Sequence, residues 1–280
     1  MHITQSAFSQ LVRELEGSLG VRLFDRTTRR IALTDAGVTL LTKMRKGVLA
    51  IDDACEEARA IARVEQGHIT VGTLASLAIG VVTRALGDLR KSHPGLKVSM
   101  REDYNGPLLE RVAQGEVDFA VCAHSDASSG LHFEPLFDDE LVAVMRRADA
   151  SQDPVLRWSA LQDAPLVMLV RDSATHEQIT AALAANRITR EPDYHVANMF
   201  TALSMVRAGF GVTFIPAMVL REVNLAGLAW KRLLRPVPLR RIGICRRSDR
   251  TPSPAAAKFE LLLRAEVERT REHTQRAFAG

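Results

Sequence analysis

The chain has 280 residues, of which 46% are hydrophobic and 25% are charged, as in a water-soluble globular protein of roughly one to three domains. It has no long apolar run and no basic-then-apolar N-terminal segment, so the sequence predicts neither a membrane-spanning helix nor a secretory signal. Three widely spaced cysteines, Cys55, Cys122 and Cys245, argue against a disulfide framework and favour a cytoplasmic protein.

Positive charge is concentrated near the N-terminus. The net charge is +4, and residues 1–47 hold eight Lys/Arg against four Asp/Glu, which accounts for the whole excess. A basic segment on a neutral body indicates a polyanionic partner for that segment. Chance clustering of charge on a solvated surface is the alternative.

The first predicted element is a helix that begins after Thr4, a residue suited to cap it, and continues through Glu16. Its apolar residues recur at three- and four-residue spacing and therefore share one face. They are Ala7, Phe8, Leu11, Val12 and Leu15.

A turn and a basic hairpin follow this helix. Gly17 and Gly20 predict the turn. Two short strands at 21–25 and 30–33, joined by the polar residues 26–29, predict the hairpin.

A long helix is predicted from Asp35 to about Glu65, with Thr34 as its N-cap. Apolar or small residues alternate at spacings of three and four along it and form an a/d seam. The seam comprises Leu41, Met44, Val48, Ile51, Cys55, Ala58 and Ala62. A seam this narrow favours a two-stranded coil, and an amphipathic helix packed on its own domain is the alternative.

From Gly67 onward, strands and helices alternate. Strands are predicted at 69–73, 98–102, 117–123, 141–146, 166–170, 194–197, 212–215 and 242–246, and helices at 76–91, 107–114, 175–185, 200–207, 216–222 and 254–276. The β-α-β-α-β order predicts parallel strands with right-handed crossovers. Two successive rounds of this pattern predict a body of two lobes.

Several motifs occur in the order found in one known family. TQSAFS at 4–9 with Leu15-Glu16 is similar to the recognition-helix signature of the LysR-type transcriptional regulators. LGVRLFDR at 19–26 and LTDAG at 33–37 resemble the wing and linker-helix start of that family. Weaker similarities lie at 115–120, 206–216 and 246–255, so the resemblance covers essentially the whole chain.

The resemblance implies an α/β chain with three parts: a partial N-terminal winged helix-turn-helix domain (1–34), a linker and dimerisation helix (35–66) and a two-lobed effector domain similar to periplasmic binding proteins (67–280). Lobe I would comprise about 67–140 plus 243–280, and lobe II about 141–242. It further implies a DNA-binding transcriptional regulator, not an enzyme, that responds to a small-molecule effector. A homodimer or homotetramer is expected, with RNA polymerase as a further partner and no cofactor or metal.

Predicted DNA contacts come from the first helix and the hairpin. Amide and hydroxyl groups near the start of a recognition helix can bond base edges and phosphates, and hairpin arginines can reach phosphate or a narrow minor groove. The residues are Gln5, Ser6, Ser9, Gln10, Arg13, Arg26, Arg29 and Arg30. For the helix residues considered alone, a solvated face is the alternative.

Relative to the family, the sequence lacks most of the helix pair that precedes the recognition helix, because Met1 stands late in the second helix of that pair. We therefore expect either a start codon placed downstream of the true one or a real truncation, with weak operator binding in the second case. The alternative function is accordingly a truncated cytoplasmic small-molecule-binding module with weak or no DNA binding.

Ligands of such α/β bodies bind outside the carboxyl ends of the strands, where loops lead into helix N-termini suited to anions. The predicted effector contacts, for an effector that could be anionic, are Ser76, Asn105, Arg171, Ser173 and Asn198. Helix capping is the alternative role for the two serines and Asn198. For Arg171 the alternatives are an ion pair with Asp172 or a solvated side chain.

Two other features predict no separate site. Cys122-Ala123-His124 lacks further metal ligands, and a cysteine that ends a buried strand is typical of a core. Nine Lys/Arg and two acidic residues lie between Arg221 and Arg250. This local excess could contact DNA or a partner subunit, and a solvated surface is the alternative. No nucleotide-binding, zinc-protease or hydrolase motif is present.

Overall fold

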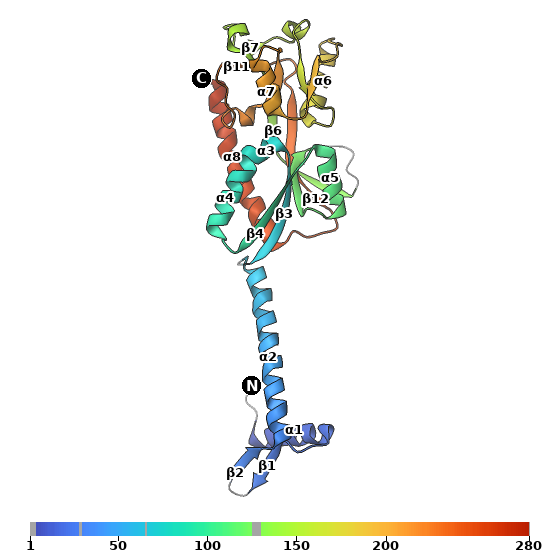
Figure 1. The fold of residues 1–280 in the computed structure, drawn as a ribbon, viewed down its shortest axis with the longest axis vertical. Coiled ribbons are helices and arrows are strands. Elements are labelled where there is room, and N and C mark those ends of the chain that lie inside the picture. Colours follow the sequence, from blue (N-terminus) through green and yellow to red (C-terminus); the bar gives the residue numbers. More distant parts are fainter. Residues whose placement is uncertain (1–3, 28–29, 65, 125–129, 280) are drawn as a thin grey trace. The chain divides into compact units, whose positions relative to one another are not determined.

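The computed structural model describes residues 4–27, 30–64, 66–124 and 130–279 of the chain. It contains two compact units, Met1–Ala62 and Arg63–Gly280 (Figure 1). Among the described residues, no helix combines the length and the apolar character that a membrane span requires.

The N-terminal unit contains two helices and a hairpin: α1 (Gln5–Leu19), β1 (Phe24–Thr27), β2 (Arg30–Leu33) and α2 (Asp35–Ala62). Thr4 caps α1 as predicted, because its side chain accepts a hydrogen bond from the backbone N–H of Ala7 at 3.4 Å. The helix is longer than predicted. It includes Gly17 and ends at Leu19, and Gly20 follows as its C-cap with a φ of +70°, which suits a glycine.

A polar junction joins α1 to the hairpin and to α2. A carboxylate oxygen of Glu16 accepts two backbone N–H groups at the start of β1, at 2.7 and 3.1 Å. Thr34 caps α2 as predicted: its hydroxyl accepts from the N–H of Gly37 at 3.0 Å and donates to the backbone oxygen of Arg22 at 2.7 Å. These bonds fix the base of the hairpin against both helices.

The seam predicted on the long helix is exposed in this unit. Leu41, Met44, Val48 and Ile51 of α2 present large apolar side chains to solvent. The helix ends at Ala62, slightly before the predicted end. An exposed apolar row on so long a helix needs a partner surface to bury it.

The C-terminal unit is built on a mixed sheet with the strand order β4-β3-β5-β12-β6-β11-β7. In the predicted division, lobe I contains β3 (Gly67–Thr73), β4 (Leu96–Glu102), β5 (Phe119–Ala123), the first part of β6 (Leu131–Arg146) and, from Gly243 onward, β12 (Leu239–Arg247). β3 pairs in parallel with β4 and β5, as predicted, whereas β12 pairs antiparallel with β5. β5 is buried along its whole length, which explains its continuous apolar sequence.

Three helical segments belong to lobe I. After β3, α3 (Ala75–Leu77), a π-helical turn (Ala78–Val82) and α4 (Thr83–Ser92) form one continuous helical run. α5 (Asn105–Gln114) follows β4, and α8 (Pro254–Ala279) is the last helix. All three lie close to their predicted ranges.

β6 joins the two lobes. Its residues up to Glu140 pair with β12, whereas those from Leu141 onward pair with β10 (Thr213–Pro216) and β11 (Leu228–Leu233). The strand therefore changes partners between Glu140 and Leu141, where the proposed lobes divide. Only its second half was predicted.

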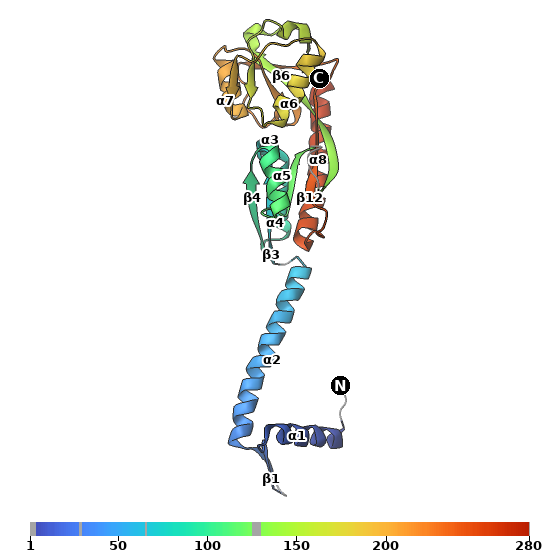
Figure 2. The same cartoon turned by 90° about the vertical axis from the view of Figure 1, so that its right-hand side faces the viewer.

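Lobe II is completed by short elements. They are η2 (Arg147–Asp149), β7 (Val155–Leu156), η3 (Trp158–Leu161), β8 (Val167–Leu169), α6 (Ala174–Ala185), β9 (Tyr194–Val196), α7 (Met199–Arg207) and η4 (Ala217–Val219). The helix predicted at 216–222 was wrong, because only the short 3-10 turn η4 forms there. β7 and β11 were not predicted. Figure 2 shows lobe II stacked on lobe I, with α6 and α7 facing α3 and α5.

One apolar core runs through both lobes. Ile69 and Phe119 of lobe I belong to the same buried cluster as Leu203 and Ile215 of lobe II. A second cluster, around Trp158, fills the far side of lobe II. Because the larger core is shared, side chains between the lobes are supported by close packing on both sides.

Candidate DNA-binding surface and effector cleft

The polar residues predicted to contact DNA share one face of α1. At about 100° per residue, they fall within an arc of about 140°. They are Gln5, Ser6, Ser9, Gln10 and Arg13. Within the described part of the chain they make only local bonds: Gln10 donates to Glu14 at 3.1 Å, Arg13 donates to the backbone oxygen of Ser9 at 3.3 Å, and the hydroxyls of Ser6 and Thr4 lie 3.1 Å apart. These exposed groups can exchange such bonds for contacts to a nucleic acid.

The opposite face of α1 is apolar, and it is exposed as well. Phe8, Leu11 and Leu15 all lie on it with large exposed fractions. Within this unit α1 buries no residue, so the helix is held mainly through its cap and through the bonds of Glu16.

The wing arginines occupy the hairpin. In its antiparallel register Arg26 lies opposite Ile31, and Arg30 lies opposite Thr27. Arg29 falls outside the described residues, as do the side chains of Arg26 and Arg30. Their predicted role in DNA contact rests on their sequence positions.

A cavity of about 500 Å³ lies between the two lobes. The residues just before or at the start of four helical segments line it: Leu74 before α3, Tyr104 before α5, Ser173 before α6 and Asn198 before α7. Each helix start carries backbone N–H groups without helical partners and a partial positive charge. Their convergence favours an anionic group on a ligand in the cavity.

The structure brings four of the five predicted effector contacts together. Ser76, Asn105, Ser173 and Asn198 all line this cavity. Arg171 does not: its side chain is 78% exposed and lies 3.9 Å from the carboxylate of Glu191. The loop after β8 brings the following Ser173, and not the arginine, to the cavity, so the predicted role of Arg171 rests on its sequence position.

Three of these residues also have structural roles. Ser173 and Asn198 accept the N–H groups of Thr175 and Thr201, at 3.2 and 2.9 Å, and so cap α6 and α7. The amide oxygen of Asn105 accepts the N–H of Ala123 at 2.9 Å. Capping uses acceptor atoms, so the hydroxyl of Ser173 and the amide NH₂ groups remain to donate to a ligand.

Sequence reasoning missed Arg240, the most buried charged group of the cavity. Arg240, on β12, is 4% exposed and donates to the carboxylate of Asp139 at 2.7 Å and to the hydroxyl of Ser76 at 3.2 Å. Among the described residues, its Nε has no hydrogen-bond partner. The signal that could have found it is the acidic stretch on β6, which pairs with β12 in register.

The partner of Arg240 is also buried. Burial raises the pKa of the Asp139 carboxyl, and the adjacent guanidinium of Arg240 opposes that shift. The other oxygen of Asp139 accepts the backbone N–H of Met218, in η4, at 3.4 Å. Arg240 and Asp139 therefore connect Ser76 of lobe I to a turn of lobe II.

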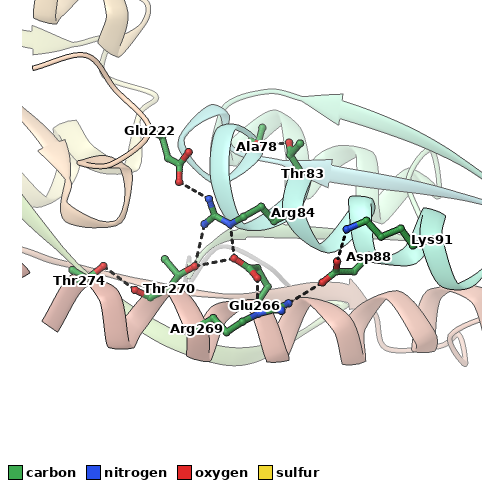
Figure 3. Close-up of polar contacts among 10 residues, drawn as sticks. All are labelled: Ala78, Thr83, Arg84, Asp88, Lys91, Glu222, Glu266, Arg269, Thr270 and Thr274. Carbon is green, nitrogen blue, oxygen red and sulfur yellow. Dashed lines mark hydrogen bonds and ion pairs between the residues drawn. The ribbon is translucent and has the colours of Figure 1, made fainter. Parts of the chain in front are cut away.

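Two further contacts tie the lobes together. At the cavity, the hydroxyl of Tyr104 in lobe I donates to the backbone oxygen of Ala197 in lobe II. Elsewhere, Arg84 of α4 donates to Glu222 of lobe II and to Glu266 of α8 (Figure 3).

The basic run between Arg221 and Arg250 is largely paired within the fold. Four of its arginines meet carboxylates of β6: Arg232 with Glu140, Arg240 with Asp139, Arg241 with Asp138 and Arg246 with Glu134. Ion pairs between β12 or β11 and β6 therefore neutralise much of this positive charge.

Cys122 is buried in the core, and no group of three potential metal ligands is found in the described part of the chain.

Comparison with known proteins identifies the family. The family model for the LysR substrate binding domain matches residues 62–268, and the model for the bacterial regulatory helix-turn-helix protein, lysR family, matches residues 1–38. The uncharacterized HTH-type transcriptional regulator YbhD of Escherichia coli (strain K12) is 28% identical over 264 residues, which cover 94% of this chain and 83% of that protein.

Solved structures agree. An OxyR mutant from Corynebacterium glutamicum is similar with a TM-score of 0.70 at 26% identity, over 98% of this chain and 88% of that chain. A full-length OxyR variant from Pseudomonas aeruginosa shares the fold, with a TM-score of 0.75 at 20% identity over 95% and 91% of the two chains. The matching families consist of transcriptional regulators, which are generally not enzymes. The chain belongs to the LysR family of DNA-binding transcriptional regulators, whose activity a small-molecule effector modulates.

Proposed function

We propose that the cavity between the lobes binds the effector, and that the effector carries a carboxylate held by Arg240 and the donors around it. The observation that carries the proposal is the buried guanidinium of Arg240, whose Nε lacks an acceptor among the described residues. A buried donor without an acceptor costs free energy, so the protein alone does not fully satisfy this guanidinium, which lines the cavity where the helix starts converge. Ser76, Asn105, Ser173 and Asn198 would supply further donors.

The remaining walls favour an apolar body on the same ligand. Leu74, Ile79, Leu169, Met199 and Phe200 line the cavity beside the polar groups. A volume of about 500 Å³ whose lining surface is mainly apolar is typical of sites for small organic molecules. The site would act by binding, not by catalysis.

Effector binding would act on DNA through the rest of the chain. In this proposal residues 1–34 contact the operator, 35–66 pair two subunits, and 67–280 form the two lobes. Binding would shift the population of lobe arrangements and hence the spacing of the paired DNA-binding domains. The regulator would act in the cytoplasm, where its DNA target lies.

The effector site is tested by thermal shift with a panel of small aliphatic and aromatic carboxylates and their neutral amides. At least one carboxylate should raise the Tm, because a ligand that binds only the folded state stabilises it, and its amide should not. Arg240→Lys keeps the positive charge but loses the planar guanidinium that can donate two hydrogen bonds to one carboxylate, so it should abolish the rise in Tm. The control is Arg241→Lys, one residue along the same strand and largely exposed. If the carboxylate raised the Tm of Arg240→Lys as much as that of Arg241→Lys, the proposed effector site would be rejected.

The DNA surface is tested by gel-shift titration at several salt concentrations. Arg13→Ala should weaken binding to all sequences and reduce the log–log salt slope by about one. Gln10→Ala should cost about 1–3 kcal/mol on the preferred operator and less on random DNA. Arg90→Ala, an exposed cation on α4, is the control for net charge. Unchanged binding in both α1 variants would exclude this face.

A further inference from the structure

The effector cavity contains an acidic residue that a simple carboxylate ligand would not need. Glu102 ends β4 and lines the same cavity as Arg240. Within the described part of the chain, its carboxylate makes no hydrogen bond and no ion pair. Its side chain is exposed, so the carboxylate is hydrated in the free protein and accessible to a charged group on a ligand that also reaches Arg240.

The neighbouring acidic residue differs, because the protein itself engages it. Asp103 accepts the backbone N–H of Tyr104 at 2.9 Å and a hydrogen bond from Arg111 at 3.4 Å. Glu102 is therefore the lining carboxylate that remains to meet a ligand.

The charge balance of the cavity points the same way. Arg240 is the one Lys, Arg or His residue among those that line it, and Asp139 already matches its charge at 2.7 Å. Arg111 likewise pairs with Asp103 at 3.4 Å, so Glu102 is the charged lining residue without a partner within the described part of the chain, and it leaves the lining acidic. A ligand with a carboxylate alone would gain at the helix starts but would meet repulsion from Glu102, whereas a cationic group beside Glu102 would be attracted.

The positions of the two charges in the sheet set the geometry of the ligand. Arg240 lies on β12 and Glu102 on β4, and the strand order β4-β3-β5-β12 separates these strands by three steps. At about 4.8 Å per step, the strands lie about 14 Å apart. The registers place Ile244 level with Glu102, so Arg240 lies four residues, about 13 Å, further along, and the two backbones are about 19 Å apart. The side chains of Arg240 and Glu102 are long, but they do not close this distance. The two charged groups of the ligand must therefore lie at opposite ends of the molecule, which excludes an α-amino acid with both groups on the same carbon.

We propose that the effector is a zwitterion, with a carboxylate bound at Arg240 and an ammonium or guanidinium at its other end bound by Glu102. Its chemical class is the ω-amino or ω-guanidino carboxylates, whose methylene or ring body would pack on the apolar walls. The inference rests on the proposed function, since it assigns the second end of the same ligand.

The experiment uses the whole chain, with matched probes in thermal shift and calorimetry. The probes are 4-aminobutanoate, 5-aminopentanoate and 6-aminohexanoate, each compared with the alkanoate of equal length. Norvaline, which carries its amine beside the carboxylate, tests the separation. At least one ω-amino acid should bind about tenfold more tightly than its alkanoate, the effect of one charged hydrogen bond.

The variants isolate Glu102. Glu102→Gln should weaken the ω-amino acid about tenfold and leave the alkanoate unchanged or slightly stronger, because only the attraction to the amine is lost. Glu102 has no partner to lose within the described chain, so the variant should fold. Glu110→Gln, on α5 and outside the lining, removes the same charge elsewhere and should change neither affinity.

Failure can be assigned to one proposal or the other. If an alkanoate or aromatic carboxylate binds in an Arg240-dependent way and the amine adds nothing, the zwitterion inference is overturned and the effector site stands. If norvaline binds as well as its ω-amino isomer, the separation of charges is wrong. If no carboxylate of either panel depends on Arg240, the proposed effector site fails and this inference fails with it.

Discussion

Arg84 of lobe I is bonded to Glu222 of lobe II, although the two residues are 138 positions apart in the chain (Figure 3). The same guanidinium donates to Glu266, and to Thr270 at 3.1 Å, on α8. One side chain thereby holds α4, α8 and the segment after η4. Hydrogen bonds to both glutamates raise the pKa of Arg84 despite partial burial, so the group stays charged.

We predict that Arg84→Met lowers the free energy of unfolding by about 1 kcal/mol, a modest figure because solvent screens the partly exposed guanidinium. Glu266 keeps its contact with Arg269 at 2.8 Å, which limits the loss. Urea denaturation at low and high salt is the measurement, and the difference should shrink at high salt. Arg276→Met, which removes an exposed 4.0 Å pair on the same helix, should have no effect. An equal loss of unfolding free energy in the two variants would show that the contact of Arg84 between the lobes stabilises the fold no more than an exposed ion pair does.

Two glycines of α2 should respond oppositely to the same substitution. A Cβ on Gly37 would lie 2.2 Å from the backbone oxygen of Leu23, whereas a Cβ on Gly47 would meet nothing within 4 Å. Gly37→Ala should therefore cost about 1–3 kcal/mol by overpacking the junction with the hairpin. Gly47→Ala should stabilise the helix by about 0.5–1 kcal/mol, because alanine has the higher helix propensity.

Hydrogen exchange of the α2 peptides in the whole chain checks both glycine variants. Protection should fall for Gly37→Ala and rise for Gly47→Ala. A rise in protection in both variants would mean that the hairpin moves away from α2 at little cost, and that the close approach of Leu23 to Gly37 is not rigid.

The seam of α2 predicts which apolar residues join two subunits. Val48 lies on the seam and its neighbour Leu49 lies off it, and both are exposed in the single chain. Val48→Asp should lower the molar mass measured by light scattering, because a charge at an a position is buried on pairing. Leu49→Asp should leave the mass unchanged. A fall in mass with Leu49→Asp alone would place the subunit contact on another face of the helix.

The elements that sequence predicted well are those whose signals are local. The cap at Thr4, the long helix α2 and the uniformly apolar β5 depend on residues close in the chain, and each has its predicted secondary structure. Ser76 and Asn105 were found for the same reason, since each stands where a strand leads into a helix.

What sequence could not give depends on distant partners. Arg240 lies within a basic run, and its role follows from Asp139, which is 101 positions away and meets it only once β6 and β12 pair. The first half of β6 was not predicted because its acidic residues interrupt the apolar pattern of a strand. Arginines of β11 and β12 pair with these residues, and those partners are distant in the sequence. At Pro216, the apolar run that suggested a helix instead packs as a short buried turn between the lobes.

Glu260 offers a test by pH. This residue of α8 is 9% exposed, its Oε2 accepts from Arg246 at 3.4 Å, and its Oε1 has no partner among the described residues. Burial raises the pKa of Glu260 above its ordinary value of 4.5, the cations Arg246 and Arg264 oppose the shift, and Glu134 adds to it. An acid whose pKa is raised on folding contributes stability that is complete below pH 4.5 and is lost as the pH rises through the folded-state value.

We therefore predict that Glu260→Gln stabilises the protein at pH 7 by up to about 1 kcal/mol, because it removes a poorly paired buried charge, and has little effect near pH 4. The slope of unfolding free energy against pH between these values should become more positive in the variant. Urea denaturation at intervals from pH 4 to 7 measures this, with Glu268→Gln on the exposed side of the same helix as the control. If Glu260→Gln is destabilising at pH 7, the attraction of Arg246 outweighs the cost of burial and the direction of the pKa shift is wrong.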